Sequence, residues 1–294
     1  MVPRQLAMAA ELLVLASIFG CSCSDGVSPY YPILYIHVQK NGGSTVEAST
    51  ELFPYGGAHS HGYLRQYEEG LDAFPAGKFV SNNRLETIMK LTKVPKSQYA
   101  RKLITAAHVR HPCTRLLSVW DYFSLVKPRG DWPNIIAHYV GDWEKNFTSF
   151  VEQVYRYSTI PRESHKMMHA HQQLDQLVFA NGSFGIDVLM FTEFWREGIS
   201  DLGKNVHANF DKLATSQINK SPGDKRCNAH YSAHTWDLLL KIYRNDFCAF
   251  GFSENLNEAT SLHPFASADF RASRPKEFWA KRVHMCSLAS NQKQ

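Results

Sequence analysis

Short apolar runs recur along the chain between polar and glycine-containing segments. Three of them are six or seven residues long and contain β-branched side chains. Runs of this length and composition predict strands buried on both faces, and they lie at 33–38, 103–109 and 186–191. The first two end in polar residues after which the spacing of apolar positions changes, so each is expected to lead into a helix.

Apolar positions three or four residues apart follow the first two runs and return near the C-terminus. Ser44 or Thr45 is expected to cap a helix that reaches about Phe53. Pro112 suits the first turn of the next helix, because its missing N–H has no partner to lose there. A third helix is predicted over 231–247. Strands alternating with helices are typical of a parallel sheet flanked by helices, so the predicted fold class is α/β in one domain.

The N-terminal region has the pattern of a secretory signal. Arg4 precedes an apolar stretch at 12–20 and small residues follow it, so residues 1–24 are expected to be a signal peptide. A membrane-apposed N-terminus is the alternative, although no uninterrupted apolar run reaches the roughly 18 residues of a spanning helix. Sequons at Asn146 and Asn181 are expected to be glycosylated in the secretory pathway.

Composition and charge narrow the class of protein. Of the 294 residues, 44% are hydrophobic and 20% are charged, which excludes a disordered chain. The net charge of +5 suits anionic ligands, but it is too small and too dispersed to indicate nucleic-acid binding. The domain is expected at 25–265, and the basic residues near the end predict a loose basic tail over 266–294.

Six cysteines indicate disulfides rather than a metal site. Cys21 and Cys23 fall near the expected cleavage point, and the other four allow three connectivities that the sequence does not distinguish. Those four are Cys113, Cys227, Cys248 and Cys286. No CxxC pair occurs, and His165, His169 and His171 lack an acidic third ligand, so no metal is expected.

The segment after the first predicted strand carries candidate chemistry. Lys40 stands just before Gly42 and Gly43, between a strand and a helix, where backbone N–H groups and the helix dipole attract an anion. A lysine beside such a turn suits a phosphate or sulfate whose charge grows during a transfer reaction. Because the lysine precedes the glycines, the spacing differs from that of an ATP-binding loop. A plain surface turn is the alternative.

The end of the second predicted strand adds another anion-binding pattern. Arg110 lies where parallel sheets bind ligands, and Ser118 follows eight positions later, about two helical turns on. A guanidinium and a hydroxyl suit a phosphate monoester. Two anion sites at two strand ends predict a nucleotide with phosphates at both ends. The alternative is that Arg110 pairs with a carboxylate and Ser118 faces solvent.

Three segments in order resemble the Golgi carbohydrate sulfotransferases. Residues 37–45, His-Val-Gln-Lys-Asn-Gly-Gly-Ser-Thr, are similar to the family's 5′-phosphosulfate loop, an HxQKTGGT-type sequence. Residues 109–118 are similar to its 3′-phosphate segment, an RxPxxRxxS pattern, and 242–252 to its C-terminal signature. The resemblance covers roughly 31–253 and is closest to the heparan sulfate 6-O-sulfotransferases. Heparan sulfate 2-O-sulfotransferases and chondroitin- and HNK-1-type carbohydrate sulfotransferases are also similar.

The resemblance implies a P-loop-like parallel sheet, the sulfotransferase fold, and 3′-phosphoadenosine 5′-phosphosulfate (PAPS) as co-substrate without a metal. It assigns the 5′-phosphosulfate to Lys40, Asn41, Gly42, Gly43, Ser44 and Thr45. It assigns the 3′-phosphate to Arg110 and Ser118. Asn41 stands where the family usually has threonine, and its hydrogen-bonding side chain is expected to preserve donor binding.

Sulfuryl transfer also requires a group that takes the acceptor's proton. The resemblance implies a catalytic histidine after the phosphosulfate loop, and His61, then His59, are the candidates. Glu47 or Glu51 is the alternative base. Lys40 is expected to stabilise the departing oxygen, because positioning and charge stabilisation dominate this kind of transfer.

Together these inferences predict a PAPS-dependent O-sulfotransferase in the Golgi lumen or associated with the Golgi membrane. Its expected acceptor is a carbohydrate hydroxyl, on a polysaccharide. A nucleotide-dependent kinase or NTPase is one alternative, but neither a lysine after the glycines nor a magnesium carboxylate at a strand end is found. A catalytically inactive glycan-binding relative is another, and it would lose the donor residues Lys40, Arg110 and Ser118, which are retained.

Overall fold

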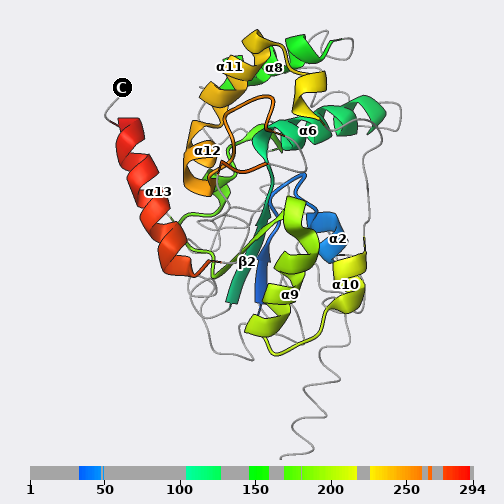
Figure 1. Ribbon diagram of the computed structural model, residues 1–294, viewed down its shortest axis with the longest axis vertical. Helices are drawn as coiled ribbons and strands as arrows, with labels where there is room; N and C mark the ends of the chain where they lie inside the picture. Colours follow the sequence, from blue (N-terminus) through cyan, green and yellow to red (C-terminus); the bar gives the residue numbers. More distant parts are fainter. Residues whose placement is uncertain are drawn as a thin grey trace, which may run out of the picture.

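A three-stranded parallel sheet forms the centre of the computed structural model (Figure 1). The structure describes residues 33–47, 49, 104–126, 146–158, 169–179, 181–216, 226–259, 264–266 and 274–291. The strands follow the order β1-β2-β3 and span Ile33–Ile36, Ile104–Val109 and Val188–Phe191. The predicted parallel α/β arrangement is confirmed. The expected signal peptide at 1–24 lies outside the described residues.

All three strands run in the same direction, so their carboxyl ends meet at one edge of the sheet. Ile36 pairs with Ala107, and Val109 pairs with Phe191. The first strand is shorter than predicted because the chain turns immediately after it, with the Val38 N–H donating to the Ile36 carbonyl at 3.1 Å. The loops that carry the candidate chemistry therefore begin at a common edge.

Helices cover both faces of this sheet. In the part of the chain that the structure describes, the α-helices are α2 (Gly43–Glu47), α6 (Pro112–Val126), α8 (Phe147–Ser158), α9 (Trp195–Asn205), α10 (Asp211–Thr215), α11 (Ala233–Ile242), α12 (Arg244–Phe250) and α13 (Lys276–Asn291). The same residues include the short 3₁₀ helices η5 (Leu174–Gln176), η6 (Thr192–Phe194) and η7 (Cys227–Ala229). Figure 1 shows α9 and α10 on one side of the sheet, α12 and α13 on the other, and α6 beyond the carboxyl end of β2.

Alternate strand residues enter two separate cores. Tyr35 and Met190 pack with Ile199 of α9, whereas Ala107 and Leu189 belong to the larger core that includes residues of α6, α8, α11, α12 and α13. Side chains of a strand alternate between faces, so a strand covered on both sides is apolar at most positions, with the buried Thr105 and His108 of β2 as exceptions. This explains why continuous apolar runs predicted the strands.

The first helix begins differently from the prediction. α2 starts at Gly43, and the N–H groups of Thr45 and Val46 donate to the Gly42 carbonyl, so neither Ser44 nor Thr45 is the cap. Gly42 has a φ of 86°, and a Cβ there would lie 2.7 Å from the Trp195 ring. Only glycine fits both the conformation and the space. The predicted end near residue 53 lies outside the described residues.

The single helix predicted over 231–247 is wrong, because the chain forms two helices that meet at Tyr243. Tyr243 has φ −109° and ψ 24°, which is not helical. Its ring is buried and its hydroxyl donates to the Ala170 carbonyl at 2.7 Å. The start of α11 is fixed by a capping box between Ser232 and Thr235.

The loose tail predicted over 266–294 is wrong for residues 274–291, which contain α13. Trp279 is fully buried in the larger core. Arg282 donates to the Ala249 carbonyl at 3.0 Å, so a residue taken for part of a solvated tail holds the end of α12. The disulfide pairs that the sequence left open are Cys113–Cys227 and Cys248–Cys286. The described helices include none long and apolar enough to cross a membrane.

Candidate functional site

The loop after β1, residues 37–43, is called the lysine loop. Lys40 has a φ of 66°, a left-handed conformation that is uncommon for a residue with a side chain. Its ammonium lies over the Tyr122 ring of α6, 4.2 Å from the centroid. A Cβ at Gly43 would meet the His37 ring at 2.1 Å. The glycine is thus required for close packing, and the loop directs its lysine toward α6.

Asn41 is fully buried and holds the lysine loop in place. Its Nδ2 donates to the His108 carbonyl at 2.9 Å and to Oε1 of Gln173 at 2.7 Å. Both N–H groups of the amide are therefore used within the protein. The remaining polar atom of the side chain is an oxygen, which cannot donate a hydrogen bond to an anion. The Asn41 side chain therefore stabilises the shape of the loop and does not bind an anion itself.

The segment after β2, residues 109–118, is called the Arg110 segment. Nε of Arg110 donates to Oγ1 of Thr114 at 3.0 Å, and Nη1 donates to the Lys40 carbonyl at 3.3 Å. The lysine loop and the Arg110 segment are thus in direct contact. Ser118 lies further along α6 with only 4% of its surface exposed, so the alternative that it faces solvent is wrong.

The end of β3 contacts both of these segments. Oγ1 of Thr192 donates to the Asn41 carbonyl at 3.0 Å and to the Val109 carbonyl at 3.2 Å. Oε1 of Glu193 accepts from the His111 N–H at 2.8 Å. Burial raises the pKa of Glu193, and the nearby Arg110 charge opposes that rise. Three neighbouring strand ends are therefore bound together.

A fourth element, residues 169–176, links the first two, and we call it the bridging segment. Oε1 of Gln173 accepts from Nδ2 of Asn41 at 2.7 Å and from the Arg110 N–H at 2.9 Å. Nε2 of Gln173 donates to the Arg110 carbonyl at 2.8 Å. Sequence reasoning missed Gln173, because it stands in a polar stretch without periodicity or a recognisable motif.

Arg115 and Asp246 both anchor the bridging segment through its main chain. Arg115 is fully buried and donates to the carbonyls of Gln39, His169 and His171 at 3.0, 2.9 and 2.8 Å. Asp246 is also fully buried. Its carboxylate accepts the N–H groups of residues 173 and 174 at 2.8 and 2.9 Å. Two buried charges of opposite sign thus fix the segment, with their hydrogen bonds satisfied inside the protein.

Comparison with known protein families identifies the family of this chain. A family model described as the sulfotransferase family matches residues 26–253, more than half of the 294-residue chain. The chain belongs to the sulfotransferase family. No match was found among curated proteins or among solved structures. The matched range includes the lysine loop, the Arg110 segment and the bridging segment, so the described site lies within the part of the chain that defines the protein as a sulfotransferase.

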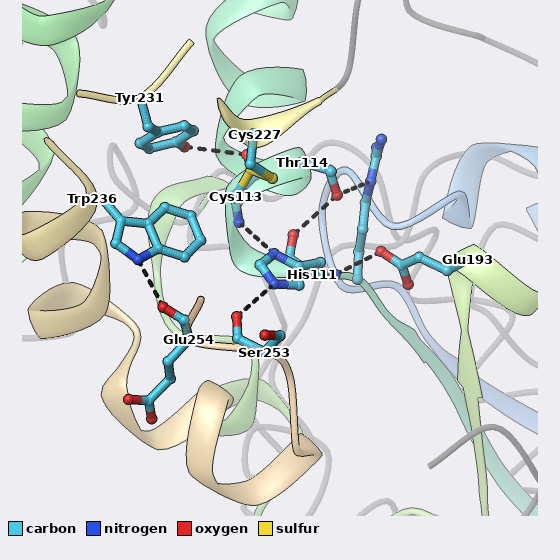
Figure 2. The surroundings of a disulfide bond; sticks show 10 residues. His111, Cys113, Thr114, Glu193, Cys227, Tyr231, Trp236, Ser253 and Glu254 are labelled. Atoms are coloured by element: carbon cyan, nitrogen blue, oxygen red, sulfur yellow. Dashed lines mark hydrogen bonds between the residues drawn. A yellow bond between two sulfur atoms is a disulfide. The ribbon is translucent and has the colours of Figure 1, made fainter. Parts of the chain in front are cut away.

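Behind the Arg110 segment of this sulfotransferase, a disulfide and a neutral histidine form a rigid support. Figure 2 shows His111 between the Cys113–Cys227 disulfide and Ser253. Nδ1 of His111 accepts from the Cys113 N–H at 3.2 Å, and Nε2 donates to the Ser253 carbonyl at 3.2 Å. Burial lowers the pKa of His111 to about 4, which keeps the ring neutral.

The same cluster has the spacing of a metal site but not its chemistry. Ligand atoms of His111, Cys113 and Cys227 lie within 4.8 Å of one another. Both sulfur atoms are joined in the disulfide, and metal ligation by cysteine requires a thiolate. These three residues therefore do not form a metal centre in the oxidised protein.

The candidate bases of the sulfotransferase remain predictions. His59, His61 and Glu51 lie outside the described residues, whereas Glu47 is the last described residue of α2. Among described histidines, His169 stacks on Tyr122 with ring centroids 5.8 Å apart. Burial, followed by the charge of Lys40, lowers the pKa of His169 to about 3, so its ring is neutral beside the lysine.

Proposed function

We propose that this sulfotransferase uses PAPS to sulfate a carbohydrate hydroxyl. The observation that carries the proposal is the hydrogen bond from Nη1 of Arg110 to the Lys40 carbonyl, at 3.3 Å. It brings two segments with a cationic residue each to the same edge of a parallel sheet, where such folds bind ligands. A donor with phosphosulfate at one end and phosphate at the other requires such a pair of sites.

The residues present fit this donor. Gly42 and Gly43 let the loop turn closely past the rings of Trp195 and His37, and Lys40 supplies a positive charge beside this turn. Arg110 and the buried hydroxyl of Ser118 suit the ribose phosphate. The main chain of residues 40–45 remains assigned to the phosphosulfate, but the Asn41 amide does not, because it is used inside the loop.

PAPS would supply a sulfuryl group bonded to a good phosphate leaving group. The ammonium of Lys40 would lie against the departing oxygen and stabilise its growing negative charge. Arg110 and Ser118 would orient the donor by its far end. His61 or His59, with Glu47 or Glu51 as the alternative, would take the proton of the acceptor hydroxyl.

The acceptor and the compartment rest on the resemblance of three segments to Golgi carbohydrate sulfotransferases. A polysaccharide acceptor is consistent with the net charge of +5, since acidic glycans favour a basic partner. A signal peptide at 1–24 would deliver the enzyme to the secretory pathway, and we propose that it acts in the Golgi lumen. The two disulfides suit that oxidising compartment.

The test is incubation of the full chain with radiolabelled PAPS and a panel of glycans, with labelled ATP and magnesium as the control. Label is expected in a glycan from PAPS alone. Label transferred from ATP would instead support a kinase. A glycan that binds without accepting label, together with absent PAPS binding, would support an inactive glycan-binding relative.

A further inference from the structure

Gln173, in the bridging segment, is hydrogen-bonded to both of the proposed donor-binding segments. Its side chain is fully buried. Oε1 accepts from the lysine loop, at Nδ2 of Asn41, and from the Arg110 segment, at the Arg110 N–H. The contacting residues are separated from Gln173 by 132 and 63 positions in the chain. One amide therefore joins two loops that the sequence places far apart.

The orientation of this amide is fully determined. Nε2 donates to the Arg110 carbonyl at 2.8 Å and to Oδ2 of Asp246 at 3.2 Å. Both N–H groups and both acceptor positions of Gln173 are thus occupied. A rotation of the amide by 180° would bring its nitrogen against two donors and its oxygen against two acceptors. The side chain consequently fixes the spacing between its partners in one arrangement.

The base of Gln173 is fixed as firmly as its amide. The Asp246 carboxylate accepts the Gln173 N–H at 2.8 Å and the Leu174 N–H at 2.9 Å. Arg115 binds the preceding carbonyls of the bridging segment and also the Gln39 carbonyl of the lysine loop. Gln173 therefore projects from an anchored backbone rather than from a loop that could follow its partners.

We infer that Gln173 is a positioning residue that sets the separation between the lysine loop and the Arg110 segment, so that one donor molecule contacts both. The inference rests on the proposed donor site. Gln173 itself does not have to touch the donor. Its role is to maintain a spacing that a ligand with two anionic ends requires and that a ligand with one anionic end does not.

This role has a specific consequence for binding. A ligand that spans two fixed sites gains affinity because its second contact is intramolecular, and this gain depends on the distance between the sites. When the spacing is no longer held, a two-ended ligand loses affinity while each one-ended ligand keeps its own contacts. General damage to the fold would instead weaken the binding of all ligands.

The chain offers a matched control in the same segment. Gln176 lies three positions after Gln173 and is equally buried, but neither its Oε1 nor its Nε2 has a hydrogen-bond partner among the described residues. Gln176→Met therefore makes the same chemical change at the same burial without breaking a link between loops. Gln173→Met removes all four side-chain hydrogen bonds and keeps the length of the side chain.

The experiment measures binding of three ligands to the full chain by calorimetry. They are adenosine 3′,5′-bisphosphate, adenosine 3′-monophosphate and adenosine 5′-monophosphate. Gln173→Met is expected to weaken bisphosphate binding by roughly tenfold or more and monophosphate binding by less than about threefold. Gln176→Met is expected to change none of the three. Equal losses for all ligands in Gln173→Met, or no loss, would overturn the inference.

A second variant protects the test against loss of folding, which thermal unfolding would detect. Gln173→Glu keeps one acceptor oxygen but places another against the Arg110 carbonyl and the Asp246 carboxylate. The same selective loss for the bisphosphate is expected, and unchanged bisphosphate affinity in a folded Gln173→Glu protein would contradict the inference. If the unaltered protein does not bind the bisphosphate at all, the proposed donor site is wrong, which differs from a failure of Gln173 alone.

Discussion

Lys40 combines an uncommon backbone conformation with a mobile charge. Its φ of 66° is held by the surrounding loop, since Arg110 binds its carbonyl and Asn41 is bonded on the other side. Strained residues persist where neighbouring contacts over-determine them, and they concentrate at functional sites. The ammonium meanwhile rests on the Tyr122 ring, a weak contact from which it can move to an anion.

Replacing Lys40 by alanine tests its catalytic role. The variant is expected to lower kcat by roughly 100-fold or more, because loss of one charge-stabilising donor at a developing oxyanion costs about that much. Folding should be preserved, since the side chain is only partly buried and its ammonium lies over the Tyr122 ring rather than in the core. Turnover is measured with labelled PAPS and thermal unfolding in parallel. Wild-type turnover in the variant would remove Lys40 from the mechanism.

Replacing Arg110 by alanine tests the other end of the donor. The expected result is a donor KM and Kd raised by roughly 10- to 100-fold, as a charge-assisted hydrogen bond contributes about 1.5–3 kcal/mol. Arg244→Ala is the matched control, because Arg244 is an exposed arginine at the start of α12. Unchanged donor affinity in Arg110→Ala would refute the 3′-phosphate assignment.

Part of the site could be predicted from sequence and part could not. Arg110 directly follows an apolar run and Lys40 stands two positions after another, so predicting their location at strand ends required only local patterns and the rule for parallel sheets. Gln173 has no local signal, because its role arises from contacts with residues 132 and 63 positions away. Asn41 was assigned to the donor by resemblance, whereas its amide contacts are visible only in three dimensions.

At the scale of elements, the central strands were predictable because burial on both faces leaves a continuous apolar run. The residues at which helices begin and end were less predictable. The break at Tyr243 depends on a distant contact with the Ala170 carbonyl, which no periodicity reveals. α13 was taken for a tail because its sequence is rich in charge, yet Trp279 and the Cys248–Cys286 disulfide fix one side of it to the core. A charged helix with a narrow apolar side resembles a solvated segment in sequence.

The importance of α13 for stability can be measured with two variants of the same helix. Trp279→Ala is expected to lower the free energy of unfolding by about 3–5 kcal/mol, because it leaves a cavity in place of a fully buried indole. Met285→Ala should change it by less than about 0.5 kcal/mol, since Met285 is 48% exposed. Denaturant titration of both variants provides the measurement. Equal, small effects would mean that α13 does not pack against the core.

At the scale of the whole molecule, buried ionisable groups link stability to pH. Burial lowers the pKa of His108 and His169 to about 3 and that of His111 to about 4, from an unperturbed value of 6.5. Asp246 has the opposite shift, from 3.8 to about 6, again because burial disfavours its charged form. Burial also raises the pKa of Glu193, so the three imidazoles act on acid stability in one direction and these two carboxyls in the other.

The balance of these groups predicts that the protein loses stability in acid. Each imidazole has a lower pKa in the folded state, so its contribution is fully present above pH 6.5. It is lost as the pH falls toward about 3 to 4, because only the unfolded chain takes up the proton. Asp246 gains stability over part of this range, from pH 6 down to about 4, and Glu193 acts in the same direction, but these are two carboxyls against three imidazoles. The free energy of unfolding should thus decrease from pH 6.5 to pH 4.5, which denaturant titration at a series of pH values measures.

One substitution separates this explanation from general acid damage. His111→Gln keeps an amide that can donate to the Ser253 carbonyl but cannot titrate, so the dependence on pH should become shallower by about one proton, or roughly 1.4 kcal/mol per pH unit near pH 5. His234→Gln is the control, because the His234 side chain is 60% exposed. A slope unchanged in His111→Gln, or a free energy of unfolding that rises on acidification, would contradict the assignment of acid lability to buried imidazoles. The expected result, a slope reduced in His111→Gln but not in His234→Gln, would mean that the fold favours the neutral form of His111. Because His111 lies behind the Arg110 segment, stability at low pH would then be connected to the strand ends where the donor is proposed to bind.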